Sequence, residues 1–253
     1  MTVRIIVATL GERASLENCL ESIKNQDFSD IEVVIVTPTK SILKVEDLAK
    51  NILKSNYEII EDSNKGLSAA INQGFEAKGE FKYFCWLNDD DELTEGSIKR
   101  SNLKLDSNPI YSAVVGTLKY RFKNSSKELS NKVSQLKLVL SEFGPNLIPQ
   151  PGSLIRKDKI DNFLLNENYK YAMDLDLFLR LKRVGKIGLI QDIQAILNYD
   201  EDTITLKNRK NASKEAFQIR ILNSRNIIFK ILNLIFYFPT LILMILIKNS
   251  IKS

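Results

Sequence analysis

Two short apolar segments near the N-terminus constrain the fold of this chain more than any other feature. Residues Val3–Ala8 and Ile31–Val36 are almost continuously apolar, and a helical spacing of Leu16, Cys19 and Leu20 lies between them. Strands that are buried on both faces have this composition, because neither face meets water. Two such strands joined by a helix are typical of a parallel sheet. The sequence therefore predicts an α/β fold with a mostly parallel central sheet flanked by helices.

The pattern along the chain extends this sheet. Tyr57–Ile60 and Phe81–Leu87 have the composition of two further strands, and Leu67–Ala77 between them has a helical period. The remaining expected elements are a helix over 95–105, a strand over 111–122, a polar excursion over 123–132, a turn and strand over 148–156, and a helix over 173–184. The strand over 81–87 runs into Asn88 and three aspartates. Ligands in such sheets bind beyond the carboxyl ends of the strands, so these acids stand where a site is expected.

The C-terminal part of the chain has a different composition. Residues 204–253 contain nine Lys or Arg and one acid, so they carry a charge of +8, whereas the other residues sum to −3. The cations surround an uncharged run, 231–247, which places them at a membrane surface rather than on nucleic acid. As a helix this run spans roughly 26 Å, slightly less than the ~30 Å of a bilayer core. We expect an α/β domain over 1–205 and a basic membrane-association tail over 206–253.

The tail also has an amphipathic segment before its apolar run. Phe217, Ile221 and Ile228 fall on one helical stripe, with Arg220 and Arg225 off it. This spacing favours a helix that lies in the membrane interface, followed by at most a single short span. A buried pair of C-terminal helices in a soluble protein is the alternative.

The N-terminus, the two cysteines and the absence of histidine limit the cellular location and the chemistry expected of this chain. Only about four apolar residues follow Arg4, too few for a secretory signal, so we expect residues 1–205 on the cytoplasmic face of the cell membrane. Cys19 and Cys85 have no metal-ligand spacing and are expected to be buried thiols in a reducing compartment. Histidine is absent. Acid–base and metal chemistry must then use carboxylates, with a hard cation such as Mg²⁺ or Mn²⁺.

Three segments together resemble one enzyme family. They are IIVATLGERASLENCLESIKNQDFSDIEVVIV, NKGLSAAINQGFEAKGEFKYFCWLNDDDEL, and PQPGSLIRKDKI followed by YKYAMDLDLFLRL. In this order and spacing they are similar to glycosyltransferase family 2, over residues 3–205. The resemblance implies a GT-A nucleotide-diphospho-sugar transferase domain over 1–205. It also implies inverting transfer from a nucleotide-sugar donor, with Mn²⁺ or Mg²⁺ as cofactor.

The acidic triplet falls on the family's metal-binding motif. Asn88, Asp89 and Asp90 occupy the DXD positions, with Asn88 in place of the first Asp. The resemblance implies that Asp90 binds the metal directly. It also implies that Asp89 contributes to donor binding and Asp91 to metal binding, each through water. On the residues alone, a solvated turn with acids that cap the next helix explains the triplet equally well.

The resemblance also places the donor. Thr9, Leu10 and Glu12 match the first loop, which contacts the nucleoside, and Lys65 before a glycine turn matches a diphosphate contact. The family's second strand ends in DDGS, whereas here Thr37 and two further residues, Pro-Thr, follow the strand. Thr37 therefore takes the place of the acid that contacts the nucleoside. A UDP-sugar is the favoured donor and a dTDP-sugar the next.

The acceptor side depends on the helix over 173–184. Asp174 matches the family's catalytic base, and Arg180 matches a residue that holds a phosphate or orients the base, or forms a surface ion pair. Asp176 shares the first turn of this helix with Asp174, and Gln150 belongs to the acceptor-side segment. Without the resemblance, acids in a first helical turn are explained by the helix dipole.

The implied function is transfer of a sugar to a hydroxyl of a lipid-linked glycan in bacterial surface polysaccharide or lipopolysaccharide synthesis. A polyprenyl-phosphate sugar transferase and a non-catalytic sugar-nucleotide-binding assembly protein are the open alternatives. A processive synthase is disfavoured, because its Gln-x-x-Arg-Trp motif follows the base, whereas the one tryptophan, Trp86, precedes it. No G-x-G-x-x-G follows the first strand, which argues against a dinucleotide-binding oxidoreductase.

Overall fold

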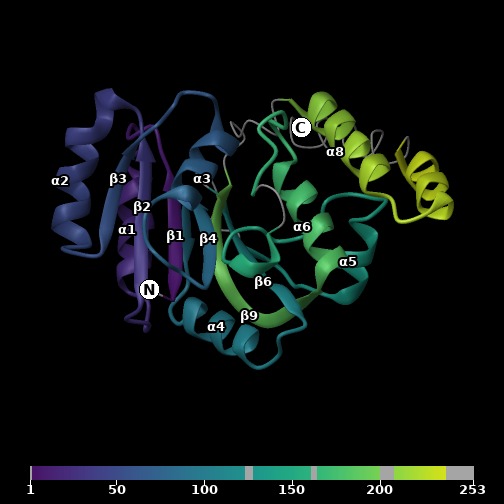
Figure 1. Ribbon diagram of the computed structural model, residues 1–253, viewed down its shortest axis with the longest axis horizontal. Helices are drawn as coiled ribbons and strands as arrows, with labels where there is room; N and C mark the ends of the chain where they lie inside the picture. The colour runs from purple at the N-terminus through teal and green to yellow at the C-terminus, as the bar shows by residue number, and fades with distance from the viewer. Residues whose placement is uncertain (1, 123–127, 161–163, 200–207, 238–253) are drawn as a thin grey trace.

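The computed structural model describes residues 2–122, 128–160, 164–199 and 208–237, and within them one mixed sheet carries helices on its sides (Figure 1). The N-terminal half alternates strands and helices. Its elements are β1 (Val3–Ala8), α1 (Ser15–Lys24), β2 (Ile31–Thr37), α2 (Ile42–Ile52), β3 (Tyr57–Glu61), α3 (Leu67–Glu76) and β4 (Tyr83–Asn88).

The second half adds shorter strands and the helices that cover the other end of the sheet. Its elements are β5 (Asp91–Leu93), α4 (Ser97–Asp106), β6 (Tyr111–Phe122), β7 (Glu128–Asn131), α5 (Gln135–Leu140), β8 (Leu154–Arg156), α6 (Met173–Val184), β9 (Lys186–Tyr199) and α8 (Arg209–Asn223). In Figure 1, α8 lies outside α6, at the end of the molecule remote from β3.

The strand order is β3-β2-β1-β4-β8-β6-β9-β5, with β7 paired to β6. The pairs within β1–β4 are parallel, and β8 runs antiparallel to both β4 and β6. Because β9 is parallel to β6, both run in the direction of β4, and β5, β7 and β8 run the other way. The expectation of a mostly parallel sheet thus holds for the N-terminal half, while the sheet as a whole is mixed.

The register brings the ends of three strands to one edge. Ala8, the last residue of β1, pairs with Val36 on one side and with Asn88 on the other. The loop after β1 and the acids after β4 therefore begin side by side. This alignment positions the candidate site.

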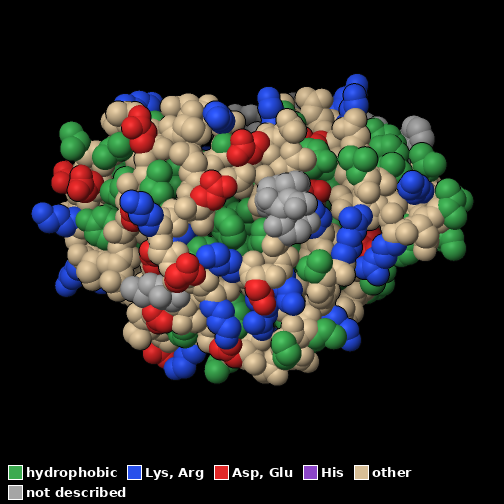
Figure 2. Space-filling view, viewed as in Figure 1, with side chains coloured by type: hydrophobic (Ala, Val, Ile, Leu, Met, Phe, Trp, Pro, Cys, Tyr) green, Lys and Arg blue, Asp and Glu red, His purple; other side chains and the backbone are tan. Residues whose placement is uncertain are grey.

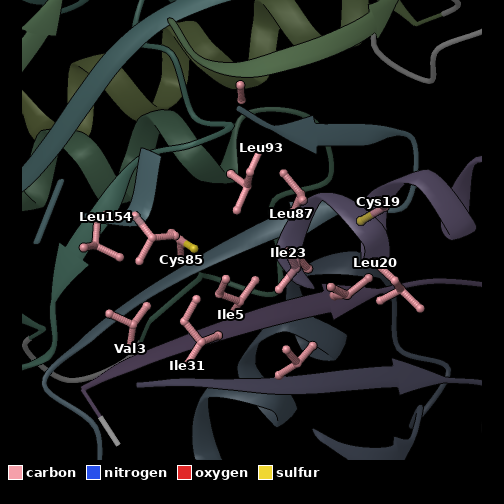
Figure 3. Packing of buried hydrophobic residues seen from close by; sticks show 14 of the residues in the cluster. Val3, Ile5, Cys19, Leu20, Ile23, Ile31, Cys85, Leu87, Leu93 and Leu154 are labelled. Atoms are coloured by element: carbon pink, nitrogen blue, oxygen red, sulfur yellow. The ribbon is translucent and has the colours of Figure 1, made fainter. Parts of the chain in front are cut away.

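The core explains why these segments become strands. Ile5 of β1, Leu20 of α1 and Leu87 of β4 belong to one buried cluster, and Figure 3 shows their side chains among those of its other members. Cys19 and Cys85 lie in the same cluster as free thiols, as expected. Burial raises the pKa of Cys85 to about 12, so it stays protonated and unsuited to metal binding.

Five of these helices and strands were not expected from the sequence, namely α2, β5, β7, α5 and β9. Helix α2 buries Val45, Ala49 and Ile52 at helical spacing, but charged residues dilute the signal. Strand β9 pairs with β6 along its length, with a register shift after Ile190 that interrupts the alternation of its side chains. The expectation of a polar excursion over 123–132 is wrong for Glu128–Asn131. These residues form β7 through backbone pairing with β6.

The C-terminal part packs on the domain more closely than expected. Ala216 and Ile219 of α8 join a buried cluster with Leu175 and Leu179 of α6. Arg220, expected on the polar face of an interfacial helix, is buried, and its Nε donates to the Ser141 carbonyl at 3.1 Å. Burial lowers its pKa to about 10.

The expectation of a single interfacial helix that carries Phe217, Ile221 and Ile228 on one stripe is also wrong. The helix is interrupted at 224–226, and residues 227–237 form a second helical segment. In the described ranges no helix combines the length and apolar character that a bilayer crossing requires. The expected boundary at 205 and most of the apolar run 231–247 lie outside the described residues, so both remain predictions.

Candidate active site

The first loop is fixed to the acidic triplet by Thr9. The Oγ1 of Thr9 donates to Asp89 Oδ2 at 2.6 Å and accepts the backbone N–H of Gly11 at 2.9 Å. Its backbone N–H donates to the Val36 carbonyl at the end of β2. Thr9 and Asp89 are both buried. The loop after β1 and the acids after β4 are therefore one structural unit.

Two of the aspartates converge on one cation. A single guanidinium nitrogen of Arg13, Nη1, lies 2.8 Å from Asp89 Oδ1 and 2.6 Å from Asp90 Oδ2. Although partial burial opposes it, the charges of Asp90 and Asp89 raise the pKa of Arg13. Arg13 was not among the residues expected at the site, because its place in the loop shows no pattern that marks it.

Asp91 has a different environment. It is 2% exposed and accepts a hydrogen bond from Asn88 Nδ2 at 3.0 Å. Burial, assisted by the charge of Asp90, raises the pKa of Asp91 to about 8. At neutral pH Asp91 is mostly protonated, so it adds little to the negative charge of the triplet. A metal-ligand role for Asp91 stays a prediction.

The arrangement fits a divalent ion that relies on substrate oxygens. In the part of the chain that the structure describes, no three or more acidic, cysteine or histidine side chains converge as a ligand cluster. Asp89 and Asp90 nevertheless direct one oxygen each at a common cationic point. Mg²⁺ and similar hard ions are often held by one or two carboxylates, with water and phosphate oxygens filling the other positions. Asp90 and Asp89 are the residues that would hold such an ion.

The other expected donor contacts differ in accessibility. Leu10 is 57% exposed and Glu12 is also exposed, with Lys40 Nζ 2.7 Å from its Oε1. This hydrogen bond and the charge of Lys40 lower the pKa of Glu12. Lys65 is exposed before Gly66, which turns the chain into α3 at a φ of 109°. Thr37 is fully buried, and its hydroxyl has no partner among the described residues.

Asp174, the expected base, is the second residue of α6. Asn146 Nδ2 donates to its Oδ2 at 3.1 Å. Asp174 is half-buried, and this burial raises its pKa above the ordinary value, opposed by hydrogen bonds from backbone N–H groups and from Asn146. A carboxylate of raised pKa is a stronger proton acceptor, which suits a general base.

The segment that carries Asn146 also reaches β4. Gln150 Nε2 donates to the Trp86 carbonyl at 2.9 Å, two residues before Asn88. The segment 146–150 thus connects Asp174 with the strand that ends in the acidic triplet. Gln150 is buried, so this contact accounts for its position.

Asp176 and Arg180 form a buried ion pair within α6. Arg180 Nε lies 3.0 Å from Asp176 Oδ2, and Asn223 of α8 donates to Asp176 Oδ1 at 3.0 Å. Arg180 also donates to the Leu164 carbonyl. These contacts tie α6 to its neighbours, and the Arg180 side chain, at 12% exposed, is a partly buried ion-pair partner rather than a surface one.

Glu215 is a further residue that sequence reasoning missed. Its carboxylate accepts the backbone N–H groups of Lys170, Tyr171 and Ala172 at 3.0, 2.7 and 2.8 Å. These residues immediately precede α6 and Asp174. The carboxylate comes from α8, more than forty residues along the chain, so no local motif could reveal it. Glu215 positions the start of the helix that carries the expected base.

Comparison with known proteins decides the family. The family model for glycosyl transferase family 2 matches residues 4–164. This chain belongs to glycosyltransferase family 2. The prediction made from the three sequence segments is confirmed.

Two relatives match this glycosyltransferase over different lengths. The Campylobacter jejuni protein named GalNAc(5)-diNAcBac-PP-undecaprenol beta-1,3-glucosyltransferase is 30% identical over 226 residues, which cover 82% of this chain and 68% of the relative. The putative glycosyltransferase EpsH of Bacillus subtilis is 27% identical over 136 residues, 53% of this chain and 38% of the relative.

Solved structures confirm the GT-A fold. A fragment of S. aureus TarS in complex with UDP-GlcNAc has a TM-score of 0.66 at 17% identity and covers 89% of this chain and 68% of that one. The mannosyltransferase PcManGT of Pyrobaculum calidifontis, in complex with GDP-Man and Mn²⁺, has a TM-score of 0.68 at 14% identity, covering 98% and 75%.

Replacing Glu215 by Gln tests its positioning role in this glycosyltransferase. The variant replaces the anionic acceptor of three backbone hydrogen bonds with a neutral amide, so we expect a loss of about 1–2 kcal/mol in the free energy of unfolding. We also expect kcat to fall while nucleotide affinity is kept. Denaturant titration and steady-state kinetics measure both, with Glu58→Gln, an exposed acid on β3, as control. Wild-type stability and kcat in Glu215→Gln would remove this role.

Replacing Asn146 by Ala tests the environment of Asp174. The base must be ionised, so kcat falls as the pH drops through the pKa of Asp174. Because the Asn146 amide opposes the effect of burial on this pKa, its removal should move the acid limb of the kcat profile to higher pH. Rates measured between about pH 5 and 8 show the limb. Asn168→Ala, in an exposed turn, is the control, and an unmoved limb in Asn146→Ala contradicts the expectation.

Proposed function

We propose that this enzyme is an inverting glycosyltransferase that moves a sugar from a nucleotide-diphosphate sugar to a hydroxyl of a lipid-linked glycan at the cytoplasmic face of the membrane. One observation carries the proposal. The converging carboxylates of Asp89 and Asp90 and the base candidate Asp174 are joined through the contacts of Asn146 and Gln150 in a family 2 fold. These are the two ends of a transfer site, one for the leaving diphosphate and one for the acceptor.

The chemistry follows from the base. Asp174 accepts the proton of the acceptor hydroxyl while its oxygen forms a bond to the anomeric carbon of the sugar. The bond between that carbon and the diphosphate oxygen breaks in the same step, so the configuration inverts without a covalent enzyme intermediate. A divalent ion held by Asp90 and Asp89 would offset the negative charge on the leaving diphosphate.

A UDP-sugar is the proposed donor, with a dTDP-sugar next. The TarS neighbour was solved with UDP-GlcNAc, whereas PcManGT was solved with GDP-Man, so the fold accepts more than one nucleotide. Leu10, Glu12 and Lys65, the residues expected to contact the nucleoside and the diphosphate, are exposed. Thr37 is buried, so its side chain would have to become accessible before it could contact the nucleoside. Calorimetric titration with UDP, dTDP and GDP in the presence of Mn²⁺ tests this. Binding of GDP in preference to the other two would overturn the donor proposal.

The acceptor proposal comes from the Campylobacter relative, whose name describes transfer to a glycan on undecaprenyl diphosphate. A lipid-linked glycan of surface polysaccharide or lipopolysaccharide synthesis is the corresponding acceptor here. The alternative is a polyprenyl phosphate acceptor. Mass spectrometry of the lipid product separates the two, because only the glycan acceptor gives a lengthened oligosaccharide.

Membrane association is proposed on the exposed face of residues 227–237. Figure 2 shows hydrophobic side chains gathered at this end of the molecule, and Ile227, Ile228 and Ile231 are 67, 61 and 49% exposed. The opposite face is docked, since Asn233 Nδ2 donates to the Glu142 carbonyl at 3.1 Å. An apolar face beside cations suits an anionic lipid surface. Flotation with anionic vesicles measures it.

A further inference from the structure

Arg13 occupies the point at which the carboxylates of Asp89 and Asp90 meet. Its Nη1 lies 2.8 Å from Asp89 Oδ1 and 2.6 Å from Asp90 Oδ2, so one nitrogen bridges both acids. Thr9 holds the second oxygen of Asp89 at 2.6 Å. The pair is thus arranged as if around a single positive centre, and the centre is part of this chain.

A divalent ion bound by the same oxygens would meet this guanidinium. Two cations at hydrogen-bond distance from shared oxygens repel each other strongly, whereas without any cation the two carboxylates repel. We propose that Arg13 is the built-in counter-cation of the carboxylate pair, which a divalent ion displaces on binding. Arg13 therefore keeps the pair in its converging geometry while the metal is absent, and it lowers the affinity for the free ion. The inference rests on the metal role given to Asp90 under the proposed function.

The structure allows the exchange. The Arg13 side chain is 56% exposed and precedes α1, whereas the Asp89 side chain is 9% exposed and fixed by Thr9. The guanidinium can therefore leave towards solvent while Asp89 stays in place. Exposed ion pairs contribute little, so we expect the competition to weaken binding of the free ion by only about two- to fivefold.

The test is a titration of chelator-treated protein comprising residues 1–253 with Mn²⁺ alone, in which electron paramagnetic resonance measures the free ion. We expect Arg13→Gln to bind Mn²⁺ about two- to fivefold more tightly than the wild type. Lys40→Gln is the matched control, because it removes the same charge from a neighbouring ion pair with Glu12 and should bind as the wild type does. Equal or weaker binding by Arg13→Gln, or an equal gain in Lys40→Gln, overturns the proposal.

Thermal unfolding gives a second measurement. In chelator, Arg13→Gln should melt below the wild type, because the acids lose their counter-charge, and Mn²⁺ should raise its Tm by more than it raises that of the wild type. If Arg13→Gln does not fold, Arg13→Lys is the substitute, because it keeps the positive charge and lacks the planar guanidinium. This variant should bind Mn²⁺ at least as tightly as the wild type. Weaker binding by Arg13→Lys counts against the proposal.

The result separates the inference from the proposed function. If neither the wild type nor Arg13→Gln binds Mn²⁺ alone, the inference about Arg13 fails, whereas the metal role of Asp90 is decided by whether UDP binding depends on Mn²⁺. If both bind Mn²⁺ with the same affinity, the metal role stands and only the role of Arg13 is wrong.

Discussion

Replacing Asp174 by Asn should lower kcat by about 10²- to 10⁴-fold, the range attributed to general base catalysis. The amide has the shape of the carboxylate and its oxygen still accepts the hydrogen bond from Asn146. It cannot take up the proton of the acceptor hydroxyl. Nucleotide affinity should stay near that of the wild type, because Asp174 serves the acceptor. Steady-state kinetics and calorimetric titration with the nucleotide measure the two effects.

Asp176→Asn is the control for this experiment. Asp176 lies on the same helix but pairs with Arg180 and Asn223, so its replacement should lower the Tm without removing the proton acceptor. Near wild-type kcat in Asp174→Asn would end the base assignment, whatever the behaviour of the control.

Replacing Asp90 by Ala should weaken metal-dependent donor binding by at least about tenfold, because the loss of outer-shell partners alone has effects of this size. Calorimetric titration with UDP in Mn²⁺ and in chelator isolates the metal-dependent part. Only that part should fall, because Leu10, Glu12 and the remaining loop are unchanged. Asp91→Asn is the comparison, since Asp91 is buried and mostly protonated at neutral pH. Unchanged metal dependence in Asp90→Ala contradicts the assignment.

The sequence was sufficient for the elements that are buried on both sides. Val3–Ala8 begins and ends as predicted, and the ends of β2 and β4 differ from the prediction by at most one or two residues, because a continuous apolar run leaves little freedom in where a buried strand lies. Strand β7 could not be predicted, since three of its four residues are polar and its hydrogen bonds come from pairing with β6. The direction of β8 likewise depends on partners distant in sequence.

The same distinction holds in the site. The places of the acids after β4 and of Asp174 in the fold were predictable, because a strand end and a helix start are visible in the local pattern, while their roles remain predictions. Arg13 and Glu215 were not, since each acts on groups brought near only by folding: Arg13 on the acids after β4, and Glu215 on the N–H groups before α6. Cations and acids in such roles look like ordinary surface charges in the sequence.

Release of nucleotide diphosphate from a panel of nucleotide sugars, with a membrane lipid extract as acceptor source, tests the proposed function most directly. Each donor is measured in Mn²⁺, in Mg²⁺ and in chelator. We expect one donor, a UDP-sugar, to be consumed only when both a divalent ion and the lipid extract are present, with loss of this activity in Asp174→Asn. Binding without release for every donor would contradict catalysis and favour a sugar-nucleotide-binding protein, and equal release in chelator would contradict the role of the metal.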